Sequence, residues 1–559
     1  SQVETPYGPR RCNDGGAWRF DPKSYRLERL QVDISNPWGF SFDTWEQPFL
    51  SDASPGENWW ALPFSAKMPY GIEQVKVEQF VPKRSRPSSG AEFVSSRHFP
   101  DVNQGDFMAC NTIGFLGISF GSKRDEGAGF VGKANGDLLS SSDGNFRPVD
   151  LEFAPDGSLY FVDWHNPLIG HMQHNARDPN RDHEHGRIYR VTYPGRPLVK
   201  PAKVDGATVA ELLENLKEPE YRTRYRTRRE LRSHAPAEVL PAIKAWVAKL
   251  DPKDSAYEHH LCEALWATWA QNQPDAELLQ RLMRAQRFEA RAAAVDVLRH
   301  SYRQIPNHVA LLQEAVRDEH PRVRLTAIVA ASWLDNAEGA KIALEAFRKP
   351  VDRWVGPVLH YALAYTLKDD VATLKASGQL DLADNPAAVE YLAGKSKIGQ
   401  PLKDNSPKPT RKLTAAEDKV FQQGREIYFR DGHCATCHQA DGKGLANIYP
   451  PLAKSDWLED DERLIKIILK GLWGPITVNG QAFDPSKGVP PMPGFGGMLN
   501  DAETAAVLNF TRLSFGNNGK LISPAQVAKV RAATQERTNF YMTEEILKEH
   551  PLKPAQGTK

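Results

Sequence analysis

The motif Cys434-Ala-Thr-Cys437-His438 constrains this chain more than any other short stretch. Two thiols at this spacing add to the two vinyl groups of haem, and the imidazole that follows ligates the iron from one side. A zinc site would need a second ligand pair at similar spacing, and no such pair lies nearby. A thioredoxin-like dithiol would need a βαβ setting, whereas this motif follows a predicted helix. The motif therefore favours covalent haem c, with zinc and a redox disulfide as the alternatives.

A haem iron held by His438 needs a sixth ligand, and two methionines follow downstream. Met492 stands between prolines in GVPPMPGF, and prolines fix φ and hold a loop rigidly. Met498 abuts a predicted helix cap at Asn500, where a packing role is favoured. We predict His438 and Met492 as the iron ligands, a pair that leaves no open coordination position and is typical of an electron relay. The residues predicted to line the pocket, with core packing as the alternative for each, are Tyr449, Pro451, Trp457 and Phe495.

The motif lies in a small domain that the sequence predicts to be all-helical over residues 411–520. One helix begins after Thr414, with Glu417 three residues on, and another begins after Asn500, with Glu503 three residues on. Both pairs have the spacing of a capping box. A polar, Pro- and Lys-rich linker is predicted at 396–410, and a helical tail at 521–559.

Helical periodicity also fills residues 204–395. Amphipathic segments anchored on Arg224, Glu263, Arg291 and Arg324 recur at steps of 39, 28 and 33 residues. Helix pairs of this length stack into an α-solenoid of the HEAT type. The alternative is an irregular helical bundle. A solenoid presents extended surfaces, so this region is expected to bind a partner or to act as a spacer between the other domains.

Residues 1–203 are rich in Gly, Pro, Asp and aromatic residues and contain short alternating runs that indicate strands. A strand–turn–strand rhythm recurs, and equating Phe42, Phe99 and Phe153 gives spacings of 57 and 54 residues. Asp52 and Asp163 end two of these units, with Cys110 near that position in the third. The period favours about three or four blades of a β-propeller over an ordinary antiparallel sheet. Because so few blades do not close a ring, we expect a further chain or a missing N-terminal segment to complete it.

Composition excludes several classes of function. The 559 residues carry a net charge of +1 without a long run of like charge, which argues against a nucleic-acid or anionic-membrane surface. No apolar stretch is long enough for a transmembrane helix. The first residues lack the core of a signal peptide, so an exported protein would begin here at a processed or truncated start. Cys12 and Cys110 could pair in an exported protein, whereas Cys262 is expected to be a buried free thiol.

Several segments together resemble one family. GREIYFRDGHCATCHQADGKGL, MPGF and NDAETAAVLNFTRLSFGN resemble class I cytochrome c domains. With SSRHFPDVNQGDF and the stretch from Asn145 to Leu198, nearly the whole chain resembles the PVC-type haem-binding CxxCH proteins, often called membrane-bound dehydrogenases. The resemblance implies a propeller related to glucose/sorbosone dehydrogenases, HEAT-like repeats and a C-terminal cytochrome c domain. One departure is NPWGF, where Trp38 and Phe40 stand in place of histidines often found in relatives, and it puts dehydrogenase activity in doubt.

The polar stretch from Phe146 to Arg190 is the candidate catalytic region. A His or Asp there would take a hydroxyl proton from a sugar or alcohol while hydride passes to a quinone cofactor, and arginines would clamp the carboxylates of that cofactor. By resemblance the cofactor would be pyrroloquinoline quinone, usually with calcium. The alternative for Asp163 is a structural role tying a turn, and a metal site at His171 and His174 is less favoured than simple loop histidines. The candidate catalytic residues are Arg147, Asp150, Asp163, His165, His183 and Arg187.

Two hypotheses follow for the whole chain. In the first, an exported, periplasmic oxidoreductase oxidises a small organic substrate in the propeller and passes electrons through a His/Met haem c to an external acceptor protein. In the second, the chain is a non-catalytic electron-transfer or scaffold subunit in which only the haem is active.

Overall fold

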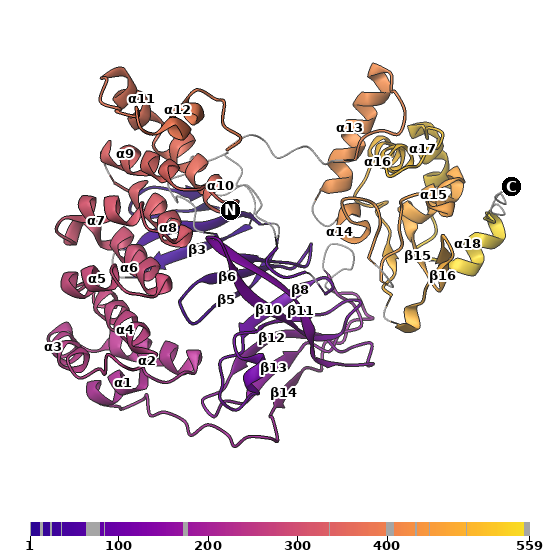
Figure 1. The fold of residues 1–559 in the computed structure, drawn as a ribbon. Coiled ribbons are helices and arrows are strands. Elements are labelled where there is room, and N and C mark those ends of the chain that lie inside the picture. Colours follow the sequence, from indigo (N-terminus) through magenta and orange to yellow (C-terminus); the bar gives the residue numbers. More distant parts are fainter. Residues whose placement is uncertain are drawn as a thin grey trace.

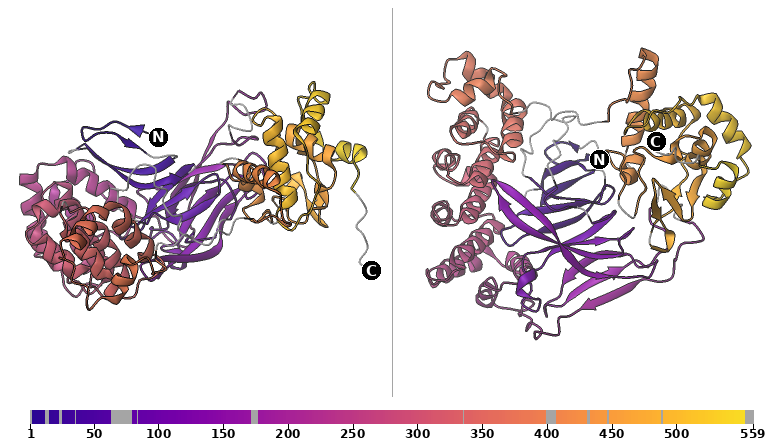
Figure 2. Two further views of the ribbon diagram at one scale, coloured as in Figure 1. Left: turned by 90° about the horizontal axis from the view of Figure 1, so that it is seen from above. Right: turned by 45° about the vertical axis from the view of Figure 1, so that its right-hand side comes forward.

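The structure is a computed structural model with three regions, and the β region lies between the helical column and the C-terminal domain (Figure 1 and Figure 2). It describes residues 2–11, 15–22, 25–34, 36–62, 79–82, 84–170, 177–334, 336–398, 407–430, 433–445, 448–487 and 489–552. Among these residues, no helix has the length and apolar character needed to cross a membrane.

The β region consists of separate small antiparallel sheets, each formed by strands that follow one another in sequence. Two sheets have two strands each: β1 (Gln2–Val3) with β2 (Arg10–Arg11), and β3 (Gly15–Asp21) with β4 (Arg26–Ile34). Two have three strands each: β5 (Pro37–Phe42), β6 (Pro48–Asp52) and β7 (Glu57–Trp60), and β12 (Pro148–Phe153), β13 (Leu159–Asp163) and β14 (Arg187–Val191). One has four strands: β8 (Ser88–Phe93), β9 (Phe107–Asn111), β10 (Gly117–Glu126) and β11 (Gly129–Ser140). A closed ring is not formed by the described strands.

The first strands of three sheets lie side by side. A side chain on Gly39 of β5 would collide with the carbonyl of Ser89 on β8, and one on Gly90 of β8 would collide with Asp150 on β12. The Ser89 hydroxyl also donates to the Pro148 carbonyl over 3.1 Å. The three strands therefore pack backbone to backbone and begin at the same end of the β region.

The internal repeat is real, but its residues differ in part from the predicted set. Pro37 pairs with Asp52, and Pro148 pairs with Asp163, each followed by the same register shift. In the middle sheet the strand-ending phenylalanine is Phe93, paired with Phe107, and Phe99 lies in a turn. The residue at the end of β9 is Asn111, so Cys110 is one place short of the aspartate position. The connection between β8 and β9 is longer than those between β5 and β6 and between β12 and β13. For this reason Phe99 does not occupy the position of Phe42 and Phe153.

The helical region stacks its helices in a curved column beside the sheets (Figure 1). The helices are α1 (Val209–Asn215), α2 (Tyr221–Ser233), α3 (Pro236–Val247), α4 (Tyr257–Ala270), α5 (Ala276–Leu282), α6 (Phe288–Ser301), α7 (His308–Ala315), α8 (Pro321–Ala331), α9 (Glu338–Glu345), α10 (Val355–Tyr361), α11 (Lys368–Ala376) and α12 (Pro386–Leu392). One hydrophobic core runs from the sheets into these helices, and Trp60 of β7 meets Trp354 at 5.8 Å between ring centroids. Cys262 on α4 is a buried free thiol, as predicted.

Three of the four predicted repeat anchors make the same contact. Arg224, Arg291 and Arg324 are each the fourth residue of their helix, and each donates through Nη1 to the carbonyls six and five residues before it. Glu263 is not equivalent to them, because the fourth residue of α4 is His260. Glu263 instead accepts hydrogen bonds from Arg224 and Arg228. Each arginine thus closes the turn between two successive helices.

Arg324→Ala is expected to destabilise the helical region by about 2–4 kcal/mol, because the buried guanidinium and its hydrogen bonds to the carbonyls of Asp318, Glu319 and Pro350 are lost. Arg324 is 3 % exposed. The control is Arg284→Ala, whose side chain is 67 % exposed beside Glu314, and which should cost less than about 1 kcal/mol. Urea unfolding followed by far-ultraviolet circular dichroism measures both, and equal losses would contradict the role of Arg324.

The C-terminal domain contains both helices and short strands, so the all-helical prediction is wrong in this respect. Both predicted capping boxes are present, at Thr414 with Glu417 and at Asn500 with Glu503. Its helices are α13 (Ala415–Phe429), α14 (Cys434–His438), α15 (Asp461–Lys470), α16 (Asp501–Leu513), α17 (Pro524–Ala533) and α18 (Thr543–Glu549), and its strands are β15 (Gly471–Trp473), β16 (Ile476–Val478), β17 (Gln481–Phe483), β18 (Met492–Pro493) and β19 (Tyr541–Met542).

Long-range contacts hold this domain together. A side chain on Gly424 of α13 would collide with the backbone of Ala506 on α16, so the two helices cross in direct contact. Leu472 of β15 pairs with Met492 on one side and with Tyr541 on the other. Val527 and Val530 of α17 enter the same core as Phe421 and Phe510. The segment after residue 520 therefore packs onto the domain. Of the predicted linker, residues 399–406 lie outside the described part of the chain.

Candidate haem site and polar cluster

The CxxCH motif forms α14, a single helical turn after α13. Cys434 and Cys437 are half-buried free thiols, three residues apart and so on the same side of the turn. The Tyr428 hydroxyl donates to the Gln439 carbonyl over 2.8 Å, which ties the end of the turn to α13. The helix thus presents both thiols and His438 from one rigid unit.

His438 is held in the orientation that an iron ligand requires. Its Nδ1 donates to the Pro450 carbonyl at 2.8 Å, so Nε2 is the ring nitrogen left for a metal. Burial lowers the pKa of His438, which keeps the imidazole neutral, the form that ligates metals. A side chain on Gly444 would collide with the carbonyls of Tyr449 and Pro450, so only glycine lets the loop fold back this tightly.

Cys434 does not have the character of a redox-active cysteine. Burial, followed by the nearby Cys437, raises the pKa of Cys434 to about 12. Redox-active cysteines have lowered pKa values that favour the thiolate. Within the described residues, no group of three or more His, Cys, Asp or Glu side chains is placed to hold a metal ion, so a structural zinc site is not supported there either. The donors present fit covalent haem c.

The other predicted haem residues fall into two core clusters. Met498 and Phe495 pack in the cluster that includes Cys434, and Phe495 also meets the ring of His433 at 5.5 Å. Met492, half-buried on β18, packs with Trp457 in the second cluster. Tyr449 is buried and Pro451 half-buried in the loop that follows the motif. The two candidate methionines thus occupy different surroundings.

One residue of the site comes from the β region and was not predicted. Arg86, just before β8, reaches across to Cys437 and Tyr449. A signal for it exists in the sequence, because Asn36-Pro37, Arg86-Pro87 and Arg147-Pro148 recur at the starts of the three neighbouring first strands. The contact with Cys437 itself depends on how the two regions dock, which a repeat cannot reveal.

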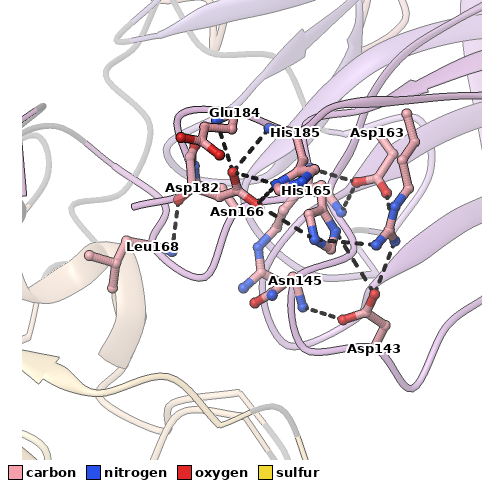
Figure 3. Close-up of polar contacts among 11 residues, drawn as sticks. Asp143, Asn145, Asp163, His165, Asn166, Leu168, Asp182, Glu184 and His185 are labelled. Atoms are coloured by element: carbon pink, nitrogen blue, oxygen red, sulfur yellow. Dashed lines mark hydrogen bonds and ion pairs between the residues drawn. The ribbon is translucent and has the colours of Figure 1, made fainter. Parts of the chain in front are cut away.

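Four of the predicted catalytic residues gather in a polar cluster at the β12–β14 sheet (Figure 3). Asp163 is fully buried, and its Oδ1 accepts the backbone N–H groups of Arg147 at 2.7 Å and His165 at 2.8 Å. Asp52 does the same for Asn36 at 3.0 Å in the β5–β7 sheet. This repeated contact supports the structural alternative for Asp163, a carboxylate that ties a turn.

His165 and Arg187 form the polar part of this cluster. Arg187 donates to Nε2 of His165 at 3.2 Å and to Asp143 at 3.1 Å, and the hydrogen bond from Asn145 N–H and then Arg187 hold the pKa of Asp143 below its usual value. Nδ1 of His165 is buried without a hydrogen bond in the described structure. His165 also has φ +50°, a strained backbone for a residue other than glycine.

Asp182 and Arg147 complete the surroundings of the cluster. The backbone N–H of Glu184 and then the contacts with His185 lower the pKa of Asp182 to about 2. Burial lowers the pKa of Arg147 to about 10, and its guanidinium donates to the carbonyls of Phe146 and Pro167. The cluster is therefore strongly hydrogen-bonded, and in the described structure its buried polar atoms without a hydrogen bond are Nδ1 of His165, Nε of Arg147 and Oδ2 of Asp163.

The remaining candidates do not join the cluster. Asp150 is exposed on β12 beside Gly90, and His183 is exposed in the turn before β14. Cys12, His171 and His174 lie outside the described residues, so the disulfide and the loop metal site remain predictions. Trp38 and Phe40, which replace histidines, are exposed on β5.

Comparison with known proteins matches separate parts of the chain to three families. These are a domain of unknown function (DUF7133) over residues 68–195, HEAT repeats over 275–364 and cytochrome c over 421–512. The second match confirms the helical repeats, and the third confirms the C-terminal cytochrome c domain and with it a covalent haem c.

Individual relatives agree with this assignment. The chain is 29 % identical over 211 residues to the cytochrome c subunit of alcohol dehydrogenase (quinone) from Gluconobacter oxydans, covering 33 % of this chain and 42 % of that subunit. It is 29 % identical over 203 residues to the gluconate 2-dehydrogenase cytochrome c subunit of Pantoea cypripedii, covering 33 % and 43 %. The chain thus spans less than half the length of these subunits.

A shorter relative is matched over most of its length. Cytochrome c-552 of Thermus thermophilus is 36 % identical over 119 residues, which is 20 % of this chain and 84 % of that protein. The match agrees with the helix α14, the thiol pair and the oriented imidazole. Through its C-terminal domain, the chain belongs to the cytochrome c family.

Proposed function

We propose that this protein is an exported electron-transfer cytochrome that receives electrons from a dehydrogenase acting on a small alcohol, sugar or sugar acid and delivers them to an external acceptor protein. The observation that carries the proposal is His438, oriented by Pro450 within a thiol pair of haem c spacing. The named relatives support the donor class, because they are cytochrome c subunits of alcohol dehydrogenase (quinone) and of gluconate 2-dehydrogenase. Attachment of haem c takes place outside the bacterial cytoplasm, which supports a periplasmic location.

Within this proposal each residue of the haem site has a distinct role. Haem c supplies a one-electron iron(III)/iron(II) couple when bound. Cys434 and Cys437 hold it covalently, and His438 and Met492 ligate the iron. Trp457 and Phe495, each less than a tenth exposed, exclude water from the pocket. Exclusion of water and a thioether ligand both favour a raised potential, as a relay requires.

The β region is proposed to be part of a propeller. Its consecutive antiparallel sheets, with first strands packed side by side and a repeated aspartate at the strand end, support this interpretation. A further chain or a preceding segment would supply the other blades. In this arrangement the sheets and the helical repeats serve as a scaffold for redox partners.

The second candidate is a dehydrogenase active site within the chain, at His165. The observation that favours it is the buried Nδ1 of His165, which has no hydrogen bond in the described structure, beside two arginines able to hold a carboxylated quinone such as pyrroloquinoline quinone. The structural role of Asp163 weighs against it, because one of its carboxylate oxygens already accepts the backbone N–H groups of Arg147 and His165.

Haem reduction separates the two candidates. The purified haem-loaded protein should be reduced by a soluble quinol and reoxidised by ferricyanide, and a panel of sugars and alcohols should leave its visible spectrum unchanged, with or without added pyrroloquinoline quinone and calcium. The second candidate would be favoured if one substrate reduces the haem, His165→Ala loses this reduction, and His183→Ala, a substitution at an exposed neighbour, keeps it. A haem that does not cycle with quinol and ferricyanide would contradict the first.

A further inference from the structure

Arg86 donates three hydrogen bonds, two to the cytochrome domain and one within the β region. Its Nη2 donates to Sγ of Cys437 at 3.4 Å and its Nε to the Tyr449 hydroxyl at 3.2 Å. Its Nη1 donates to the carbonyl of Ser54 at 3.3 Å, in the turn between β6 and β7. One guanidinium thus joins two segments of the cytochrome domain to two sheets.

The backbone around Arg86 is held firmly. Gly56 has φ +69°, and a side chain there would collide with Ser85 and Arg86. The chain after Arg86 enters β8, whose neighbours β5 and β12 pack against it through Gly39 and Gly90. The guanidinium is therefore projected from a rigid strand end and not from a free loop.

A second contact bears on the same part of the cytochrome domain. Gly114, with φ +75° in the turn between β9 and β10, lies so close to the side chain of Ile448 that any Cβ would collide with it. Ile448 and Tyr449 directly precede Pro450, whose carbonyl orients His438. Both contacts from the β region thus involve the loop whose Pro450 carbonyl orients His438. Figure 1 shows α14 on the side of its domain that faces the sheets.

We propose that Arg86 is a positioning residue that docks the haem-binding loop onto the β region and places a fixed positive charge at the haem edge carried by Cys437. In the haem-loaded protein the Cys437 sulfur would be a thioether, and Arg86 would lie beside that point of attachment. A cation there favours iron(II) over iron(III), because the reduced state carries one positive charge fewer. The electrostatic half of the inference rests on the proposed function, and the docking half rests on the contacts alone.

The docking also brings the haem motif to the end of the β region that carries the polar cluster. Arg86 and Arg147 precede the neighbouring strands β8 and β12, which the Ser89–Pro148 hydrogen bond holds together. Because these strands begin at the same end of the β region, the haem motif and the His165 cluster share that end. The face of the haem site held by Arg86 is thus turned toward the sheets, and an external acceptor must approach from elsewhere.

The test compares Arg86→Gln with Arg84→Gln in the full haem-loaded chain. Arg84 lies two residues earlier, is 48 % exposed at its side chain and pairs with Asp137 at 3.2 Å within the same sheet. Arg86→Gln should increase the radius of gyration in small-angle X-ray scattering and shift the haem midpoint potential to a lower value. Arg84→Gln should leave both unchanged. Arg86→Lys, which keeps the charge, should restore most of the potential.

The outcomes are separable from those of the proposed function. Scattering and potential of Arg86→Gln identical to those of Arg84→Gln would overturn the inference. A lower potential with unchanged scattering would overturn the docking role, and an expanded particle with unchanged potential would overturn the electrostatic one. If the proposed function is wrong, the haem of the unmodified protein will not cycle between quinol and ferricyanide, whatever its scattering.

Discussion

Replacing both Cys434 and Cys437 by alanine is expected to abolish covalent haem attachment completely. Each thiol supplies one thioether bond to a haem vinyl group, and the two sit on one side of the α14 turn. With neither present, only the iron ligands His438 and Met492 would hold the haem, without a covalent bond. A pyridine haemochrome spectrum of denatured protein, and extraction with acidified organic solvent, measure what remains bound.

The control for this experiment is Cys262→Ala. Cys262 is fully buried in α4, far along the chain from the motif, so its loss tests whether any cysteine substitution reduces haem content. It should retain the haem of the unmodified protein. Haem that resists acidified solvent in the double variant would show that the motif is not the attachment site. If the wild-type protein contains no haem and forms a Cys434–Cys437 disulfide under mild oxidation, the motif is a redox disulfide and not a haem site.

Local signals in the sequence predicted local structure well. The capping boxes at Thr414 and Asn500 formed as expected, because a cap depends only on residues within one helical turn. Arg224, Arg291 and Arg324 marked the helical repeats for a similar reason, since each bonds carbonyls only five and six residues away. Glu263 lies three residues beyond His260, the equivalent position of α4, and forms an ion pair with Arg224 across two helices.

Signals that depend on distant pairing were missed. The strands of the cytochrome domain are two or three residues long, and β15 gains its partner β19 only from residue 541 onward. Such short strands have no alternation for a pattern to detect. The contact of Arg86 with Cys437 joins residues 351 positions apart and requires both regions to be docked.

The same distinction applies to the candidate catalytic residues, of which some are brought together by strand pairing and others are not. Arg147, Asp163, His165 and Arg187 meet because β12, β13 and β14 are adjacent strands whose ends coincide. Asp150 is excluded by the period of the strand, since it lies on the exposed side of β12 between inward-facing neighbours. The many polar residues between Phe146 and Arg190 therefore predicted where the cluster lies, but not which of them belong to it.

Met492→Ala is expected to remove the sixth iron ligand and produce the largest change in redox behaviour. Loss of a thioether ligand lowers the haem potential by a sizeable part of the ~0.8 V range that axial ligands cover. It should also abolish the weak sulfur-to-iron charge-transfer band at the red end of the visible spectrum, and the vacated position should bind carbon monoxide in the ferrous state. Potentiometric titration and visible spectroscopy measure these effects.

Met498→Ala is the matched control, because both methionines are half-buried and a similar packing loss is expected for each. It should keep the charge-transfer band, the potential and the resistance to carbon monoxide. Met492 has the stronger claim, since prolines on both sides fix its backbone and its pairing with Leu472 anchors it to the domain sheet. Met498 instead precedes the cap of α16 and shares a core cluster with Phe495. If Met498→Ala loses the band while Met492→Ala keeps it, the sixth ligand is Met498, which already packs in the core cluster of Cys434.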